Sequence, residues 1–322
     1  MFRIKLCFLL VFLSAGNPLF AQKLVHVPSE NYSDVDDHIL TLAQKQFANT
    51  DSLAAELATF KKTHLKLRAV YRWVATNIVA DVVGIKNPKK GIDKPNDVLK
   101  YKKATPLGYA NLVNALCEKL SIPCEVVAGF SRTAYSPAGV VVKDPNHYWN
   151  TVKMYNKWYL LDAFMGSGTL DKKANVFTQK YNDIYFVPNP RQFILNHLPM
   201  RADKQYLDTL IDKKTFFSYP VVYNGFFQNG VYALTPADGN LKIKQGQTKK
   251  MSFKLIDSLI VDNIEIYDRK LKTKENVPFS QSGNIVSFTA DFKKPKKQMA
   301  DIFVNGKMVA SYRLYMRKTD EE

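Results

Sequence analysis

The stretch KKATPLGYANLVNALC, residues 102–117, predicts a short loop that leads into an apolar helix. Thr105 is of the residue type that caps helix N-termini, which makes Pro106 the first residue of the helix. A proline is well tolerated there, because the N–H that it lacks would have no partner within the helix. Leu112 and Leu116 follow at helical spacing and are expected to face a core. The geometry of a helix start thus explains why a proline is tolerated at position 106. The open question is which catalytic chemistry remains available with a proline there.

Helices are predicted before this stretch and strands after it. Ser33 is the expected N-cap of a helix over residues 33–48, with Asp36 at the capping-box position, and apolar residues recur at helical spacing over residues 63–79. Residues 84–97 are rich in proline and glycine, which indicates a loop. Farther along the chain, β-branched and alternating apolar residues predict strands over residues 124–132, 147–154 and 157–163. Helices packed on an antiparallel sheet, the α+β class, follow from this order.

The C-terminal residues have a different pattern. Beyond about Gly230, short stretches alternate apolar and polar residues with a period of two. Asn305-Gly306 lies between two such stretches and is a strong signal for a β-hairpin. Short strands at this spacing predict an Ig-like β-sandwich of about 90 residues. The expected domains are therefore an α+β domain with an N-terminal helical extension over residues 22–229, and a β-sandwich over residues 230–322.

The first residues predict a secretory signal peptide over residues 1–21. Arg3 and Lys5 flank an apolar run, CFLLVFLSAG, and Ala21 supplies a small residue before a cut ahead of Gln22. This run is too short to span a bilayer comfortably, so we expect cleavage and no transmembrane span afterwards. The mature protein is then expected to be exported, either to the periplasm or to the cell surface and beyond.

The charge balance of the 322-residue chain is strongly basic. There are 46 Lys and Arg against 29 Asp and Glu, which gives a formal charge of +17. The basic residues are spread along the chain, as is typical of a solvated surface, and attraction to an anionic envelope polymer or to lipid headgroups is the alternative. Nucleic acid is not expected as a partner, because no nucleic-acid-binding motif is present.

Two cysteines, Cys117 and Cys124, remain once the signal peptide is removed. An oxidising compartment permits one disulfide between them, and two buried free thiols are the other interpretation. Cys117 lies about 16 Å along the predicted helix from Pro106, at 1.5 Å per residue. Cys124 begins a strand. Neither is therefore placed as a nucleophile at a helix N-terminus.

Two polar residues on the predicted hairpin could carry acid–base chemistry. His147 begins one predicted strand and Asp162 lies at the end of its partner strand, so antiparallel pairing could bring their side chains within hydrogen-bonding reach. A thiol enzyme needs such a pair together with a cysteine at a helix N-terminus, where the helix dipole stabilises the thiolate. No metal or other cofactor is predicted, since no ligand spacing is found among His26, His38, His64 and His197.

The order of these motifs resembles that of the transglutaminase-like superfamily, and within it the kyphoscoliosis-peptidase-like branch with its bacterial exported members. The similarity covers roughly residues 60–200 and more weakly the rest. It is carried by AVYRWVATNI, by DVLKYKKATPLGYANLVNALCEKLSIPCEVVAGF, by NHYWNTVKMYNKWYLLDA and by YFVPNPRQFILNHLP. The resemblance implies a papain-like arrangement of helices on an antiparallel sheet, and chemistry on peptide amide bonds.

The chain departs from the family at the residue that should attack. The family reads Cys-Gln-Gly-Tyr-Ala where this chain reads PLGYA from Pro106, so the resemblance puts a proline in the place of the nucleophile. The family's histidine and aspartate fall on His147 and Asp162. Around this degenerate triad the resemblance implies a cleft lined by Thr105, Gly108, Tyr109, Tyr148, Trp149, Asn150, Phe164 and Met165.

These observations favour a pseudoenzyme that binds a peptide or protein segment in a degenerate catalytic cleft. The alternative from the enzyme class is an active amide hydrolase or acyltransferase with a non-standard nucleophile, for which Thr105 is the nearest hydroxyl. A third hypothesis is a structural envelope scaffold whose β-sandwich makes the interactions. No catalytic residue is assigned from the sequence with the cysteine absent.

Overall fold

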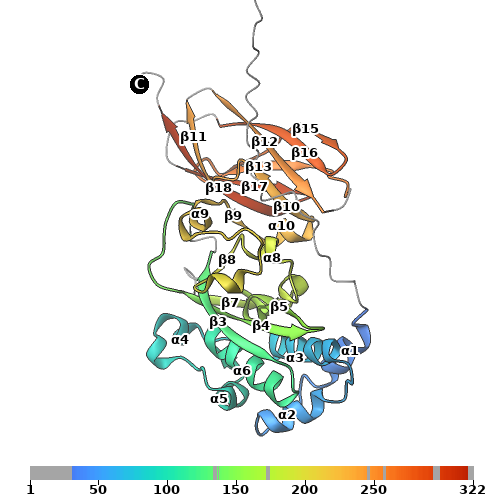
Figure 1. Cartoon of the computed structure of the whole chain (residues 1–322). Coiled ribbons are helices and arrows are strands. Elements are labelled where there is room, and N and C mark those ends of the chain that lie inside the picture. Colours follow the sequence, from blue (N-terminus) through green and yellow to red (C-terminus); the bar gives the residue numbers. More distant parts are fainter. Residues whose placement is uncertain are drawn as a thin grey trace, which may run out of the picture.

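A computed structural model describes residues 31–132, 136, 138–171, 175–244, 247–256, 259–292 and 298–317. Figure 1 shows the longer helices at one end of the molecule and two stacked β-sheets at the other, with short helices and connections between them. The predicted signal peptide lies outside the described residues. Within those ranges, no helix combines the length and the apolar character that crossing a bilayer requires. The α+β class followed by a β-rich C-terminal part is confirmed.

Two long helices of the N-terminal part agree with the sequence prediction. Helix α3 spans Thr63–Asn77, and α6 spans Pro106–Lys119 with Thr105 as its N-cap. The prediction for residues 33–48 is wrong in extent, because α1 spans only Ser33–Thr41 and Tyr32, not Ser33, stands at its N-cap. The other α-helices and the 3₁₀ turns are α2 (Thr50–Leu57), α4 (Val82–Lys86), η2 (Pro88–Lys90), α5 (Pro95–Tyr101), α7 (Ala163–Ser167), η3 (Asp183–Tyr185), α8 (Pro190–Phe193), η4 (Ala202–Gln205), α9 (Lys213–Ser218) and α10 (Asn224–Gln228).

The prediction of one uninterrupted loop over residues 84–97 is also wrong. Parts of α4 and α5 and all of η2 form within this range. The carboxylate of Asp81 caps α4 by accepting the N–H of Gly84 at 3.1 Å, and Pro95 stands at the first position of α5. Proline and glycine in this segment therefore start and separate short helices, as their preferred positions at helix ends allow.

The sheet of the N-terminal part has the strand order β5–β4–β3–β8 and is antiparallel throughout. Strands β3 (Cys124–Ser131), β4 (His147–Met154) and β5 (Lys157–Leu161) confirm the three predicted strands, and β8 (His197–Pro199) extends the sheet beside β3. Both residues of the β4–β5 turn have positive φ, 48° at Tyr155 and 62° at Asn156, as a tight two-residue hairpin requires.

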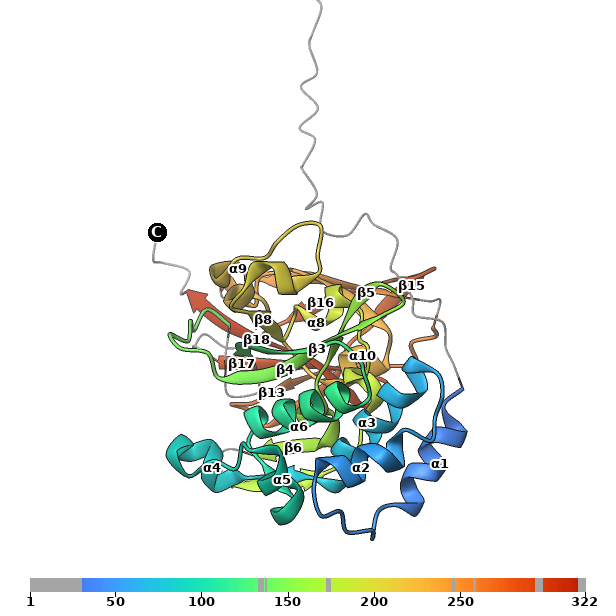
Figure 2. The same ribbon diagram turned by 60° about the horizontal axis from the view of Figure 1, so that its bottom comes forward.

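Helix α6 lies against this sheet (Figure 2), and contacts between the two set the position of the N-terminus of α6 relative to β4. The side-chain amide of Asn150 on β4 donates to the carbonyl of Ala110 in the first half of α6 at 3.0 Å. Leu112 and Leu116 of α6 pack with Trp73 of α3 in one core, all without solvent exposure. The buried faces of α3 and α6 thus hold the N-terminus of α6 beside the first residue of β4.

The C-terminal part is a sandwich of two sheets around a separate core. One sheet has the order β10–β12–β16–β15, and the other has the order β11–β18–β17–β13–β14 with β9 also paired to β18. Asn305 and Gly306 both have positive φ in the β17–β18 turn, which confirms the predicted hairpin. The strands of the sandwich are β9 (Val221–Val222), β10 (Val231–Thr235), β11 (Asn240–Lys244), β12 (Thr248–Leu255), β13 (Ile264–Asp268), β14 (Thr273–Asn276), β15 (Phe279–Ser282), β16 (Ile285–Asp291), β17 (Gln298–Val304) and β18 (Lys307–Arg317).

The segment between the two parts belongs structurally to both. The predicted boundary at residue 230 falls one residue before β10, but Val222 of β9 and Phe226 of α10 already pack in the core of the sandwich. Gly225 allows α10 to approach β18 closely, since a Cβ there would lie 2.3 Å from the carbonyl oxygen of Met308. Two small strand pairs complete the fold: β1 (Val79–Ala80) with β2 (Lys103–Ala104), and β6 (Gly168–Asp171) with β7 (Val176–Gln179).

Shortening a core leucine of α6 should destabilise the protein strongly. Leu116 is 0% exposed, so Leu116→Ala is expected to lower the free energy of unfolding by about 2–5 kcal/mol through lost burial and a residual cavity. The matched control is Leu40→Ala in α1, where 53% of the residue is exposed and a change within about 0.5 kcal/mol is expected. Urea unfolding at pH 7 compares the two variants, and equal losses would contradict this assignment of the core.

Candidate functional site

The N-terminus of α6 is built by a capping network. The Thr105 hydroxyl accepts the N–H of Gly108 at 3.3 Å and donates to the carboxylate of Asp93. Pro106 follows as the first helical residue. Because both hydrogen-bonding functions of the Thr105 hydroxyl are occupied and the residue is buried, this threonine acts as the cap of the helix.

His147 and Asp162 form the hydrogen bond that the sequence predicts. His147 is the first residue of β4, and Asp162 follows β5 directly and caps α7 through Oδ1, which accepts the N–H of Met165 at 2.9 Å. The other carboxylate oxygen, Oδ2, lies 2.6 Å from Nε2 of His147. Burial would raise the pKa of Asp162, but the two imidazoles beside it outweigh burial and lower that pKa. An ionised carboxylate only accepts, so the His147 ring donates from Nε2.

The second imidazole belongs to His197, which the sequence analysis set aside. Its Nε2 lies 2.9 Å from the same oxygen of Asp162, and its Nδ1 lies 2.6 Å from the side-chain oxygen Oδ1 of Asn196. The ring stacks on Phe193 with centroids 3.8 Å apart. No local pattern in the sequence marks this residue, because β8 brings it to Asp162 only through its pairing with β3.

The ligand-type atoms of His147, Asp162 and His197 lie within 4.8 Å of one another. The spacing of the histidines in the sequence did not indicate this group. The separations of 2.6 and 2.9 Å from Oδ2 of Asp162 are those of charge-assisted hydrogen bonds. The cluster therefore reads as one carboxylate shared by two imidazoles, which orients the ring of His147.

A cavity of about 480 Å³, called the His147 cavity below, opens beside this cluster. It brings Pro106 and His147 together, as the sequence predicts, with Phe164 and Met165 of the predicted cleft. The sequence analysis missed the other walls, which are Ile85, Ser131, Arg132, Asn146, Gly168, Thr169, Leu170, Tyr185, Asn196, Val222, Tyr223, Asn224, Gly225, Lys307 and Met308. Those from Val222 onward come from β9, from the start of α10 and from β18, so both parts of the chain build the cavity.

The remaining residues of the predicted cleft do not line this cavity. Tyr109 is buried and donates from its hydroxyl to the carbonyl of Ile78, and Asn150 is occupied by Ala110. Trp149 is buried against Phe193 and Gly129, where a Cβ would lie 2.3 Å from the indole. Structural packing rather than ligand contact therefore explains these side chains. Thr105, Gly108 and Tyr148, the other members of the set, also do not line the cavity.

Neither cysteine lies in the His147 cavity. Cys117 is buried in the core of the N-terminal part, and Cys124 lies half-buried at the start of β3. Both are free thiols in this structure rather than a disulfide. A hydrogen bond with Cys124, together with burial, raises the pKa of the Cys117 thiol well above its usual value. A buried thiol with a raised pKa is a poor nucleophile.

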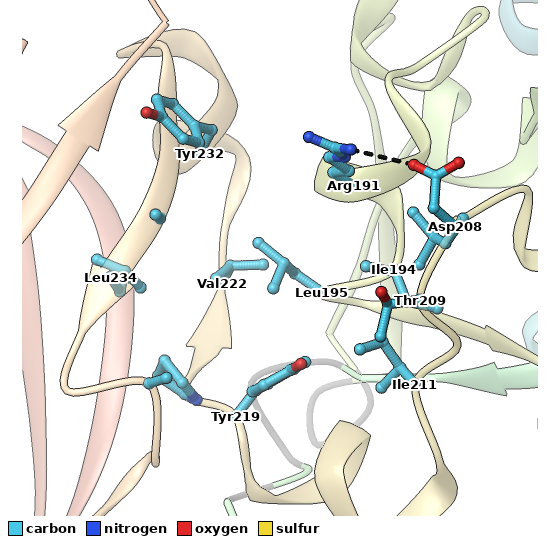
Figure 3. A pocket seen from close by; sticks show the side chains of 14 residues that line it. Arg191, Ile194, Leu195, Asp208, Thr209, Ile211, Tyr219, Val222, Tyr232 and Leu234 are labelled. Carbon is cyan, nitrogen blue, oxygen red and sulfur yellow. Dashed lines mark hydrogen bonds and ion pairs between the residues drawn. The ribbon is translucent and has the colours of Figure 1, made fainter. Parts of the chain in front are cut away.

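A second hollow, of about 290 Å³, lies between α8, the segment that follows η4, and β10 (Figure 3). Its walls are largely apolar, with Leu195, Ile211 and Leu234 among them. At its rim Arg191 forms an ion pair with Asp208 at 3.3 Å, drawn as a dashed line in Figure 3. The lining of this hollow differs from that of the His147 cavity. Its arginine, Arg191, is paired with a carboxylate, and its described lining includes no histidine.

Part of the chain matches the model of a known protein family. Residues 51–163 match the family model of the transglutaminase-like superfamily, a range that includes Pro106, His147 and Asp162. Among curated proteins, the chain is similar to kyphoscoliosis peptidase of Homo sapiens, with 27% identity over 61% of this chain and 30% of that protein. It is also similar to hillarin of Drosophila melanogaster, with 24% identity over 89% of this chain and 38% of that protein.

The matches extend over only part of each relative. The chain spans less than two fifths of the length of human kyphoscoliosis peptidase and of hillarin. A crystal structure of a TGase aligns with a TM-score of 0.28 and 20% identity, over 51% of this chain and 39% of that chain, and a score this low adds nothing to the assignment.

Acid should weaken the fold through His197. Burial lowers the pKa of His197 to about 4, in spite of the hydrogen bond to Asp162, whereas an unfolded histidine titrates near 6.5. Between about pH 6.5 and 4 the unfolded chain therefore binds a proton that the folded chain refuses, and stability is lost as the pH falls. The expected contribution is about 3.5 kcal/mol in full, at 1.4 kcal/mol for each pKa unit between about 6.5 and 4.

The measurement is urea unfolding of the wild type and of His197→Gln at pH 7.5 and at pH 4.5. The variant keeps a side-chain donor and should show a smaller loss between the two pH values, even if it is less stable at both. His38→Gln, which changes a half-buried histidine of α1, is the control. An unchanged pH dependence in His197→Gln would contradict the assignment.

Proposed function

We propose that this protein is an exported, non-catalytic transglutaminase-like protein that holds a peptide or protein segment in the His147 cavity. The observation that carries the proposal is Pro106, which stands at the first position of α6 in the same cavity as His147. The family resemblance puts the nucleophilic cysteine at this position. A proline has neither a thiol to attack a carbonyl nor an N–H to stabilise the oxyanion.

The cost of this replacement for acyl-transfer chemistry is large. Loss of one oxyanion donor alone typically costs about 3–4 kcal/mol in the transition state. Thr105, the adjacent hydroxyl, is engaged by Asp93 and Gly108, so it is not free to attack. Cys117 lies about 16 Å farther along α6, beyond hydrogen-bonding reach of His147. The imidazole is thus oriented for a reaction whose nucleophile is missing.

The character of the His147 cavity favours a peptide as its occupant. Its walls combine apolar side chains, such as Phe164, Met165 and Met308, with amides at Asn146 and Asn224. Apolar surface with a few polar groups is typical of sites that bind extended organic ligands. The names of the human and mouse relatives, kyphoscoliosis peptidase, point to the same substrate class.

Restoring the sulfur should restore a reactive thiol. Pro106→Cys places a cysteine at the N-terminus of α6, in the same cavity as His147, where the helix dipole and the imidazole favour the thiolate. We expect iodoacetamide to label this cysteine about tenfold faster at pH 7 than the cysteine of Thr169→Cys, which lies in the same cavity but at no helix N-terminus. Mass spectrometry of the labelled peptides measures both rates. Equal rates would show that the remaining site no longer activates a nucleophile.

A second candidate function, amide or ester hydrolysis, rests on Ser131. This serine lines the His147 cavity and lies on β3, where its backbone is opposite His197 of β8 in the strand register. Turnover of a p-nitrophenyl ester or labelling by a fluorophosphonate that disappears in Ser131→Ala, and remains in Thr169→Ala, would favour this candidate. We expect neither turnover nor labelling above background in the wild type.

A further inference from the structure

Arg132 is a buried cation in the wall of the His147 cavity. It directly follows β3, and its backbone N–H donates to the carbonyl of Asn196 at 3.0 Å, which fixes the main chain. The residue is only 2% exposed and lines the cavity together with His147. Arginine is rarely buried to this extent without a partner of opposite charge.

Among the described residues, the hydrogen bonds of Arg132 leave Nε without a partner and Nη2 with a single long contact. Nη1 donates to the carbonyls of Phe216 at 3.1 Å and Pro220 at 3.4 Å, and Nη2 makes one long contact, 3.4 Å, to the carbonyl of Ser136. Nε has no partner in the described part of the chain. The carbonyl contacts explain how the guanidinium is positioned, but not what its Nε–Nη2 edge is for.

Another arginine of the same chain shows what this edge binds. Arg68, which is also buried, places Nε and Nη2 on the two carboxylate oxygens of Asp36 at 2.7 and 2.6 Å. Burial opposes the charge of Arg68, but the hydrogen bonds to Asp36 and Asp183 outweigh it and raise the pKa. This side-on pairing of two N–H donors with two oxygens is the strongest form of ion pair in proteins.

Arg132 differs from Arg68 in its counter-charge. Among the described residues, no carboxylate lies within ion-pair distance of it, and the described lining of the cavity contains no Asp or Glu. Burial lowers the pKa of Arg132 to about 10, which still leaves it charged at pH 7. Lys307, in another wall, adds a second positive charge. A buried charge without a partner costs several kcal/mol, and an anion bound beside it would remove that cost.

We propose that the Nε–Nη2 edge of Arg132 is the anchor for a carboxylate of the ligand in the His147 cavity. The inference rests on the proposed function and narrows its ligand to a carboxylate-bearing peptide. The carboxylate is either an acidic side chain or a C-terminus, since both present the same two oxygens. A phosphate dianion is less favoured than a carboxylate, because the partial negative charges on the carbonyls of Phe216, Pro220 and Ser136 repel two charges more than one.

The test compares three N-acetylated peptides by isothermal titration calorimetry on the full chain. The first is Leu-Phe-Glu-Ala-amide, the second is Leu-Phe-Gln-Ala with a free C-terminus, and the third is the neutral Leu-Phe-Gln-Ala-amide. We expect one of the two carboxylate peptides to bind at least tenfold more tightly than the neutral peptide, and which of the two does so identifies the source of the carboxylate. Inorganic phosphate, titrated alone, is expected to bind more weakly than that peptide.

Three variants assign the effect to Arg132. Arg132→Gln should remove the preference for the carboxylate, and Arg132→Lys, which keeps the charge but not the two-donor edge, should retain only part of it. Arg201→Gln removes the same charge from an exposed site and should change nothing. Thermal melts show whether each variant folds. If Arg132→Gln does not fold, the role of Arg132 is decided by the peptide preference of the wild type and its change in Arg132→Lys.

Each outcome bears on one or both proposals. If the wild type and Arg132→Lys each bind all three peptides equally tightly, the carboxylate anchor is overturned and peptide binding still stands. Tighter binding of inorganic phosphate than of either carboxylate peptide would overturn the ligand class. Failure of every peptide to bind at millimolar concentration would reject both the anchor and the proposed function.

Discussion

The buried carboxylate of Asp162 is the constraint on which the site depends. It accepts the N–H of Met165 at the start of α7 and the imidazoles of His147 and His197. These partners come from three different segments, so one charged group joins β4, the end of β5 and β8. Such a group is tolerated inside the protein only because its oxygens are satisfied by these donors. Removal of the carboxylate would leave two buried imidazoles without their common acceptor.

The rest of the N-terminal part aligns α6 with this cluster. Asn150 connects β4 to Ala110, and the leucines of α6 pack against α3. Pro106 therefore reaches the cavity of His147 because of contacts made farther along the same helix and strand. A protein that has no use for a nucleophile can keep all of these contacts, since none of them involves the side chain at position 106.

The sequence was informative where the interactions are local. The alternation over residues 147–161 and the turn between the strands predict the hairpin, and hence the approach of His147 to Asp162. Thr105 and Pro106 predict the start of α6. The cleft prediction was less successful, because residues next to the site along the chain, such as Tyr109 and Trp149, point into the core instead.

Long-range pairing supplied what the sequence could not. His197 reaches Asp162 through the β3–β8 ladder, and no spacing between the two positions signals that contact. Arg132 reads in the sequence as one of many basic residues, and only its burial without a carboxylate distinguishes it. The walls contributed by Tyr223 and Lys307 depend on how the sandwich docks, which is a property of the whole fold.

The docking of the sandwich has an evolutionary consequence. Strand β9 and helix α10 lie before the predicted boundary, yet they pack with β18, and Gly225 admits no larger residue there. The two parts are therefore not modules that recombination could exchange freely, because a foreign sandwich would bring a new wall to the cavity and meet a mismatched surface at α10. Selection on what the cavity holds would instead act as correlated change in both parts.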